Sequence, residues 1–221
     1  MRILSILHYT FFGGPHNRTL RMSDVLASRG AEIIAVLPDE PGNAVQRLMA
    51  SGIHTRTLPL HRVRLNPISN ARAALSFIPD VQRLRRLIRE TKADVVQING
   101  AENPHGAIAG YLEGIGVVWQ LLGSGMPSLA RRGIVPIMRR LSGAVMVVGE
   151  NLSRYYPGIS SLDRRLISFY PPIDHAAFDP EKVTGNALKE KLNIAPNDLV
   201  VGTTGNINPA KAHHHFIQAA A

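Results

Sequence analysis

Short apolar runs alternate with longer helical patterns along most of the chain. The runs cover residues 2–7, 32–37, 94–98, 116–122, 143–148, 164–169 and 198–204. Most are apolar almost throughout, which is typical of parallel strands that are covered on both faces. Between them, apolar residues recur at helical spacing, first at Met22, Val25 and Leu26 and later at Leu75, Ile78, Val81, Leu84 and Ile88. This alternation predicts an α/β fold with a doubly wound, mostly parallel sheet.

The character of the sequence changes near Tyr170. The stretch YPPIDHAAFDPEKVTGN is rich in proline, as connections between domains often are. It precedes a short helical pattern, the run 198–204 and the start of another helix, and a single strand and helix cannot bury both faces of a sheet. We therefore expect residues 1–175 to form one domain, and residues 176–221 to form a connection and the first strand-helix unit of an incomplete second domain.

Composition narrows the class of protein. The 221 residues are 45% hydrophobic and 19% charged, as in globular domains. The chain has no cysteine, which excludes disulfides and thiol chemistry and favours a reducing, cytoplasmic location. No run of about 18 apolar residues predicts a membrane span, and the opening MRILSIL is too short for a signal peptide.

The net charge of +9 favours an anionic partner. Nucleic acid is disfavoured, because aromatic residues make up only 5% of the chain and no RNA-binding or zinc-finger motif is present. The paired arginines at 131–132 and 139–140 are either a solvated surface or a contact with an anionic membrane surface. His213, His214 and His215 do not predict a metal site, since successive helical residues point about 100° apart.

Glycine and polar residues follow the predicted strands, at the edge where such sheets bind ligands. Gly13 and Gly14 precede a helix, so backbone N–H groups and the helix end could face an anion, although such a pair is more often only a turn. Their spacing does not match the dinucleotide-binding fingerprint. His16 and Asn17 lie at the same helix entrance as the two glycines. Asn103 and His105 follow the run 94–98, and Gly123 and Ser124 follow the run 116–122. His105 is equally well explained as a capping residue, and the glycines around Ser124 do not form a hydrolase motif.

Taken together, the segments resemble the family 4 glycosyltransferases, which are retaining, nucleotide-sugar-dependent enzymes with two Rossmann-like domains in the GT-B fold. The resemblance rests on FFGGPHNRTL, ADVVQINGAENPHGAIAG, GVVWQLLGSG, SFYPPIDHAAFDP and VVGTTGNINPAK. It implies that Gly13 and Gly14 lie near the donor phosphates. It also implies that Lys211 and Asn206 occupy the positions of a basic phosphate-binding pair, with Asn206 in place of the usual arginine.

The resemblance further implies an acceptor-binding side formed by His16, Asn17, Asn103, His105, Gly123 and Ser124. The chain departs from the family at Leu122, where a histidine is frequent, and at Gly149, where serine is common. The paired acidic motif of the family would lie beyond residue 221, so we expect this chain to be inactive alone.

The predicted function is transfer of a sugar from a nucleotide-diphosphate donor to a hydroxyl acceptor, which could be a glycan, a lipid-linked sugar or a small molecule. The resemblance implies no cofactor and no essential metal. Two alternatives remain open at this point: a non-catalytic module that binds a phosphorylated ligand, and a GT-B-type sugar-nucleotide epimerase.

Overall fold

A computed structural model of the chain describes residues 1–61, 73–102, 104–123, 125–179, 181–182, 186–205, 207 and 211–220. The chain separates into two compact units, residues 1–172 and 173–221. The assignment of the second unit to the start of a donor-binding domain stays a prediction.

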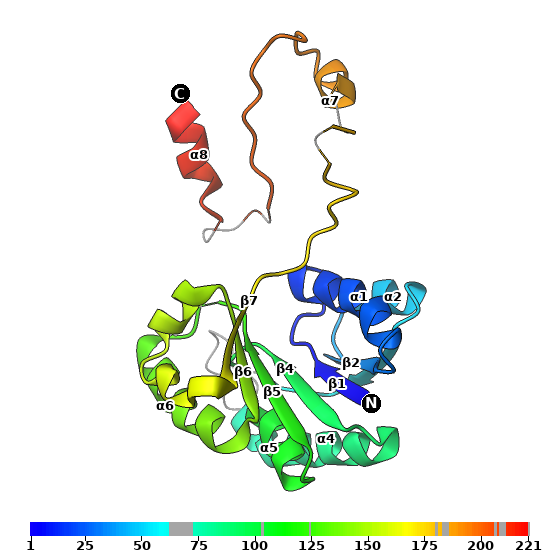
Figure 1. Cartoon of the computed structure of the whole chain (residues 1–221), viewed down its shortest axis with the longest axis vertical. Helices are drawn as coiled ribbons and strands as arrows, with labels where there is room; N and C mark the ends of the chain where they lie inside the picture. The colour runs from blue at the N-terminus through cyan, green and yellow to red at the C-terminus, as the bar shows by residue number, and fades with distance from the viewer. Residues whose placement is uncertain are drawn as a thin grey trace. The chain divides into compact units, whose positions relative to one another are not determined.

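Seven strands in the described part of the first unit form one parallel sheet, in the order β3-β2-β1-β4-β5-β6-β7 (Figure 1). The strands are β1 Arg2–Ile6, β2 Glu32–Pro38, β3 His54–Leu58, β4 Val95–Asn99, β5 Gly116–Leu121, β6 Ala144–Val148 and β7 Leu166–Phe169. The chain winds outward from β1 to β3 and then crosses back to β4. The doubly wound, Rossmann-like fold is therefore confirmed, with its topological switch point between β1 and β4.

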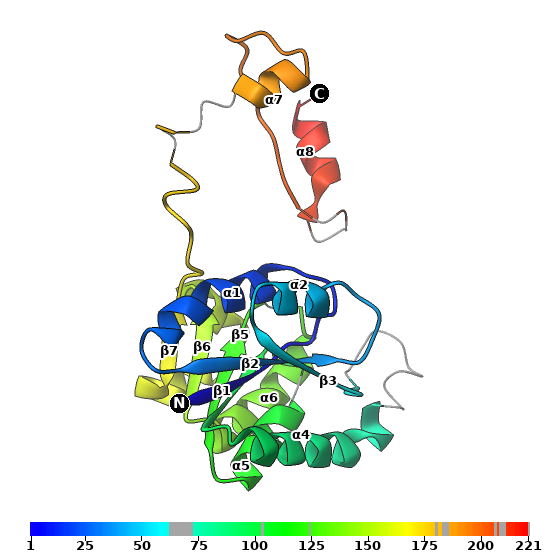
Figure 2. The ribbon, with the colours of Figure 1, turned by 90° about the vertical axis from the view of Figure 1, so that its right-hand side faces the viewer.

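Helices cover both faces of this sheet (Figure 2). On one face lie α1 Gly14–Ala27 and α2 Ala44–Ala50; on the other lie α4 Phe77–Thr91, α5 Pro104–Leu112 and α6 Ser128–Leu141. Two 3-10 helices, η1 Glu150–Tyr155 and η2 Ile159–Arg165, precede β7. The second unit contains α7 Asn186–Lys191 and α8 His213–Ala220. None of the described helices is long and apolar enough to cross a bilayer.

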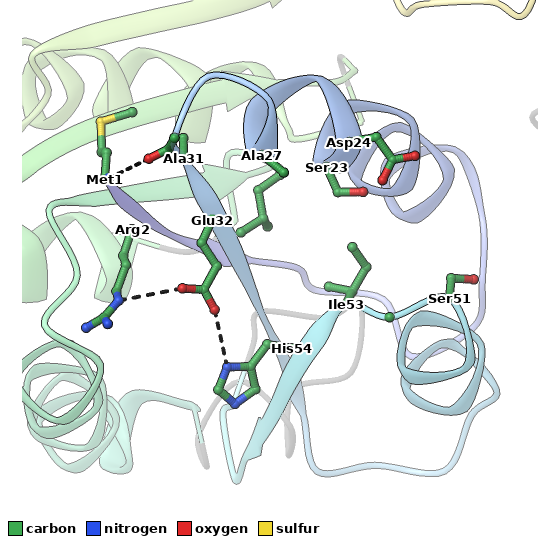
Figure 3. Close-up of a pocket in the computed structure, with 13 residues that line it drawn as sticks. Met1, Arg2, Ser23, Asp24, Ala27, Ala31, Glu32, Ser51, Ile53 and His54 are labelled. Carbon is green, nitrogen blue, oxygen red and sulfur yellow. Dashed lines mark hydrogen bonds and ion pairs between the residues drawn. The ribbon is translucent and has the colours of Figure 1, made fainter.

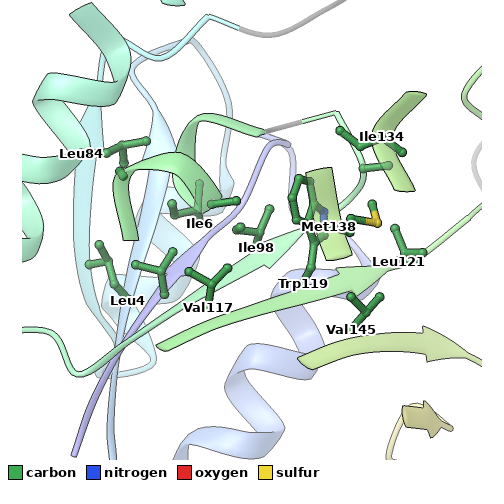
Figure 4. Close-up of a cluster of buried hydrophobic side chains, with 14 of the residues drawn as sticks. Leu4, Ile6, Leu84, Ile98, Val117, Trp119, Leu121, Ile134, Met138 and Val145 are labelled. Carbon is green, nitrogen blue, oxygen red and sulfur yellow. The ribbon is translucent and has the colours of Figure 1, made fainter. Parts of the chain in front are cut away.

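The apolar runs form two separate buried clusters. The larger lies between the sheet and helices α4 to α6 and includes Trp119, Ile98 and Met138, each fully buried (Figure 4). The smaller includes Leu37 and Leu48 and lies on the side of α2. Burying one such side chain stabilises the fold by roughly 1.5–3 kcal/mol, so the two clusters hold the sheet edges in place.

Two strand predictions differ from the structure. The sequence predicts no strand at β3, because HTRTL is largely polar; β3 forms as an edge strand that pairs with β2 alone. The strand expected over 198–204 is wrong: none of these residues forms a strand, and Leu199 and Val201 are 90% and 70% exposed. A strand needs a neighbour to pair its backbone groups, and no described residue of the second unit provides one.

The apolar stripes expected on two helices are only partly buried. Val25 on α1 and Ile78 on α4 are exposed, as is Leu75 just before α4. The buried side chains of α1 are instead polar, namely His16, Arg18 and Thr19.

Candidate functional site

The segment that follows β1 is fastened to the segment that follows β2. The backbone N–H of Ala44 donates to the carbonyl of Thr10 at 2.9 Å, and the N–H of Phe12 donates to Oδ1 of Asn43 at 2.8 Å. A Cβ on Gly42 would lie 2.2 Å from the carbonyl oxygen of Thr10, so only glycine fits there. This packing fixes the chain where it enters α1.

Gly13 and Gly14 lie exposed at the start of α1. Gly13 is extended, with φ −158°, and neither residue has a positive φ. A Cβ on Gly14 would meet no atom within 4 Å, and one on Gly13 would lie 4.0 Å from the carbonyl of Phe11. The fold therefore does not require glycine at either position, and open space lies beside the backbone at a helix N-terminus.

His16 is fully buried inside its own loop. The N–H of Gly13 donates to Nδ1 of His16 at 3.1 Å, so Nε2 carries the proton and donates to the carbonyl of Tyr9 at 2.8 Å. Burial lowers the pKa of His16, although its two backbone hydrogen bonds oppose this. His16 thus shapes the glycine loop from within, whereas Asn17 is exposed beside it.

The loops after β1 and β4 meet at the switch point. A Cβ on Gly100, which has φ 103°, would lie 2.6 Å from Oε2 of Glu102 and 3.2 Å from Cδ2 of His8. The indole N–H of Trp119 donates to the carbonyl of Gly100 at 2.8 Å. The segments that follow β1 and β4 and a residue within β5 are therefore in contact here.

Arg18 lies at the centre of a buried polar cluster. Its Nη2 donates to Oδ1 of Asn99 at 2.7 Å and to Oε1 of Gln120 at 2.5 Å. The amide of Asn99 donates in turn to Oγ of Ser5 and to the carbonyl of Ile6, both at 3.0 Å. The cluster connects α1 with β1, β4 and β5. Sequence reasoning did not propose Asn99 or Gln120 as site residues, although Asn99 directly follows an apolar run and Gln120 lies within one.

His105 lies between α4 and α5. It is 5% exposed, its ring lies 4.6 Å from that of Phe77, and its Nε2 is enclosed without a partner among the described residues. Burial lowers the pKa of His105, with Asp80 raising it and His61 lowering it further. His105 is accordingly a packed residue behind the loop that follows β4.

Asp80 is a second buried charged residue that the sequence did not indicate. It is 0% exposed and accepts from the N–H of His61 at 2.8 Å, from the ring Nδ1 of His61 at 3.1 Å and from Nη1 of Arg83 at 2.6 Å. These bonds join the first turn of α4 to the segment that follows β3.

The loop after β5 is held by Tyr156. The hydroxyl of Tyr156 donates to the carbonyl of the exposed Gly123 at 2.8 Å. Burial raises the pKa of Tyr156 to about 12, and the charge of Glu102 acts in the same direction. Gly149, at the end of β6, has φ 66°, a conformation that disfavours serine.

The remaining candidates are divided between the units. Lys211 lies in the second unit beside Gly205, whose added Cβ would lie 3.5 Å from Cγ of Lys211. Asn103, Ser124 and Asn206 fall outside the described residues.

A hollow of about 560 Å³ lies at the opposite, amino edge of the sheet (Figure 3). Glu32 lies there between Arg2 and His54, at 3.6 Å from Nε of Arg2 and 3.8 Å from Nδ1 of His54. These charges compensate one another, and none of the predicted site residues lines this hollow. The carboxyl edge is therefore the candidate functional site.

Several solved structures share this fold. HepE of Anabaena, in complex with UDP-glucose, matches with a TM-score of 0.75 and 18% identity over 100% of this chain and 57% of that protein. A glycosyltransferase of Rickettsia africae matches with a TM-score of 0.67 and 16% identity over 89% of this chain and 50% of that protein. UDP-GlcNAc 2-epimerase of Neisseria meningitidis, bound to UDP-GlcNAc, matches with a TM-score of 0.58 and 12% identity over 90% of this chain and 55% of that protein.

The chain thus spans a little over half the length of the structures it resembles. No curated protein matches it. The model of one family, described as the glycosyl transferase 4-like domain, matches residues 13–155, which begin at the glycine pair and end in η1. The chain belongs to the family of glycosyl transferase 4-like domains.

Proposed function

We propose that this chain is the acceptor-side part of a retaining glycosyltransferase that uses a nucleotide-diphosphate sugar. The observation that carries the proposal is the open backbone at Gly13 and Gly14, at the N-terminus of α1 and next to the switch point, in a chain of this family. A helix N-terminus attracts anions, because its first N–H groups are unpaired and its dipole is positive there.

In the proposed reaction, a sugar leaves a diphosphate and is transferred to a hydroxyl group with retention. The backbone at Gly13 and Gly14 faces the leaving diphosphate in this proposal. The N–H of Gly14 stabilises the charge that develops there, whereas the N–H of Gly13 already donates to Nδ1 of His16. Lys211 and Asn206 are proposed to contact the same phosphates. Asn17, Asn103, Gly123 and Ser124 are proposed to contact the acceptor, whereas the buried His16 and His105 support the loops beside it. The proposed reaction needs no metal, so EDTA is expected to leave the activity of the full-length protein unchanged.

A UDP-sugar is the first donor to test, because HepE, which has the same fold, was solved with UDP-glucose. The test is isothermal titration of the 221-residue chain with UDP- and GDP-sugars. We expect weak binding or none, because the chain spans only 57% of HepE and Lys211 is the one described residue proposed for the basic pair. Tight binding would contradict the division of the donor site between two domains.

The genomic reading frame after Ala221 gives a second test. A continuation with two glutamates spaced eight residues apart supports the transferase, whereas an immediate stop codon favours a non-catalytic module that binds a phosphorylated ligand.

An epimerase is the second candidate function, favoured by the match to the Neisseria enzyme. Incubation of the full-length protein with UDP-GlcNAc distinguishes the two candidates: an epimerase interconverts the sugar at C2 without an acceptor, whereas the proposed transferase releases UDP only when a hydroxyl acceptor is present.

We further propose that α6 contacts an anionic membrane on its cytoplasmic face. Arg132, Arg139 and Arg140 are exposed on α6 and form no ion pair with a described acidic residue, and Leu129 in the first turn of the same helix is 80% exposed. Three of the four arginines of α4 differ, since Arg85 and Arg89 pair with Glu113 and Arg83 pairs with Asp80; the fourth, Arg86, is exposed. Each arginine near such a surface contributes about 1 kcal/mol.

The membrane proposal is tested by sedimentation with vesicles of phosphatidylglycerol and phosphatidylcholine. Binding is expected at low salt and is expected to be lost at high salt, because salt screens the charges. The double variant R139E/R140E should not sediment. A control reverses two charges elsewhere, with R21E at a half-buried position on α1 and R29E at an exposed position just after it, and should bind as the parent does. Equal loss of binding in the two double variants would contradict a role for α6.

A further inference from the structure

Arg18 is a charged side chain that the protein buries without an acid. It is only 6% exposed, and it forms no ion pair with a carboxylate of any described residue. Burial lowers the pKa of its guanidinium, and no nearby carboxylate opposes this. Arginine keeps its proton even so, and a buried charge is costly unless an opposite charge compensates it.

The partners of Arg18 satisfy only one of its three nitrogens. Its hydrogen bonds to Asn99 and Gln120 both come from Nη2. Nε and Nη1 have no hydrogen-bond partner in the described part of the chain. Some polar atoms of the protein lack a partner and are also fully enclosed, but Nε and Nη1 do not belong to that group. These two nitrogens therefore remain in contact with solvent and have N–H groups to donate.

The protein holds Arg18 in one orientation. The amide of Asn99 donates to Ser5 and Ile6, and that of Gln120 approaches Sδ of Met146 at 3.6 Å, so both amide oxygens face the guanidinium. The ring of Phe169 lies 5.3 Å from Cζ on another side. A cation fixed in this way has little conformational freedom to lose when it binds an anion.

Arg18 is also placed where an anionic ligand is expected. Asn99 ends β4 at the switch point, Gln120 lies next to the end of β5, and Phe169 ends β7. Arg18 lies four residues after Gly14, within the first two turns of α1. The positive helix end and the guanidinium therefore act on the same region.

We propose that Arg18 binds an oxyanion of the ligand, a phosphate or a carboxylate, at the carboxyl edge of the first unit. The ion pair supplies the negative charge that the described protein groups do not. The inference rests on the proposed function only for the source of the anion, which is either the donor diphosphate or an acidic group on the acceptor.

The test is NMR observation of the Nε–H signal of Arg18 in the 221-residue chain. The probes are pyrophosphate, glucose 1-phosphate, glucuronate and UDP-glucose, each added at constant ionic strength. We expect a saturable shift of the Arg18 signal with at least one probe. A shift with both pyrophosphate and UDP-glucose indicates that Arg18 binds the donor diphosphate. A shift with glucuronate or glucose 1-phosphate, but not with UDP-glucose, indicates that it binds an acidic group of the acceptor.

Variants provide the second measurement. R18Q removes the charge but keeps an amide donor for Asn99 and Gln120, and it should weaken binding of the active probe about tenfold or more, as expected for a lost charge-assisted hydrogen bond. R18K should retain part of the affinity. R21Q, a control with the same loss of charge on α1, should leave the affinity unchanged.

Two results would overturn the inference: no probe shifts the Arg18 signal, or R18Q and R21Q bind equally well. If UDP-glucose shifts Gly13 and Gly14 but not Arg18, the proposed function stands and the role of Arg18 fails. If glucuronate alone shifts Arg18, the role of Arg18 stands without the donor. Because the wild-type signal is measured first, a variant that fails to fold does not prevent a decision.

Discussion

His16 and His105 are both enclosed by the protein, at 0% and 5% exposure. His16 has each ring nitrogen bonded to the backbone of its loop, and His105 packs on Phe77. Burial is the largest influence on both groups and lowers each pKa below the ordinary value of 6.5. Both rings are therefore neutral near pH 7 in the folded protein.

These two histidines predict that the protein loses stability in mild acid. Below pH 6.5, the unfolded chain binds protons that the folded chain does not, so the free energy of unfolding is highest above 6.5 and falls as the pH decreases toward the lowered pKa values. Urea denaturation at several pH values between about 7.5 and 5.5 measures how steeply the free energy of unfolding changes with pH. His105→Leu should flatten it, whereas His175→Asn at an exposed position should not. A parent protein whose stability is constant over this range would contradict the assignment.

Glycines near the site differ in what they do for the fold, and this difference can be measured. Gly42→Ala places Cβ against the backbone of Thr10 and should lower the free energy of unfolding by about 1–3 kcal/mol. Gly14→Ala meets open space and should leave stability nearly unchanged, while weakening the binding of a phosphate-containing ligand. Equal destabilisation by the two substitutions would show that Gly14 is needed for folding.

At the scale of elements, Asp80 links α4 to the segment after β3. A buried carboxylate that accepts from His61 and Arg83 is held by compensating charge, so removing it leaves Arg83 unpaired. Asp80→Ala should lower the free energy of unfolding by about 1.5–3 kcal/mol in urea denaturation, the range for lost hydrogen bonds to a charged group, because His61 and Arg83 can still reach solvent. Glu32→Ala, which breaks exposed ion pairs with Arg2 and His54, should cost less than about 1 kcal/mol. If the two variants lost similar free energies of unfolding, the role of Asp80 as a buried link between α4 and the segment after β3 would be contradicted.

The apolar runs predict six of the seven described strands. Five of these are inner strands covered on both faces, and the sixth, β7, is an edge strand whose residues LISF are still mostly apolar. The other edge strand, β3, escapes this signal because its residues are largely polar. The run 198–204 shows the reverse: an apolar segment forms no strand where the described residues offer no partner strand. The pattern therefore predicts a strand correctly only where partner strands are present.

The candidate site could also be predicted only in part from the sequence. The glycine loop and Gly123 can be predicted, because strand order alone places them at the carboxyl edge. The contacts of Arg18 cannot, since its partners Asn99 and Gln120 are 81 and 102 residues away along the chain. His16 and His105 were predicted at the right edge, but their burial depends on packing that a sequence pattern does not contain.

At the scale of the whole first unit, the two edges of the sheet differ in charge. Around the amino-edge hollow, Glu32 is paired with Arg2 and His54. The carboxyl edge combines the N-terminus of α1 with Arg18, which has no acidic partner among the described residues. This difference, in a chain of net charge +9, favours an anionic ligand at the carboxyl edge.

The central claim is that the substrate binds at the carboxyl edge and not in the amino-edge hollow. NMR titration of the 15N-labelled chain with UDP-glucose tests it most directly, because weak binding is still visible as shifts of individual amides. We predict shifts concentrated at Gly13, Gly14 and the first turn of α1. Shifts concentrated at Ala31, Glu32 and Ile53 would place the ligand in the amino-edge hollow and contradict the account.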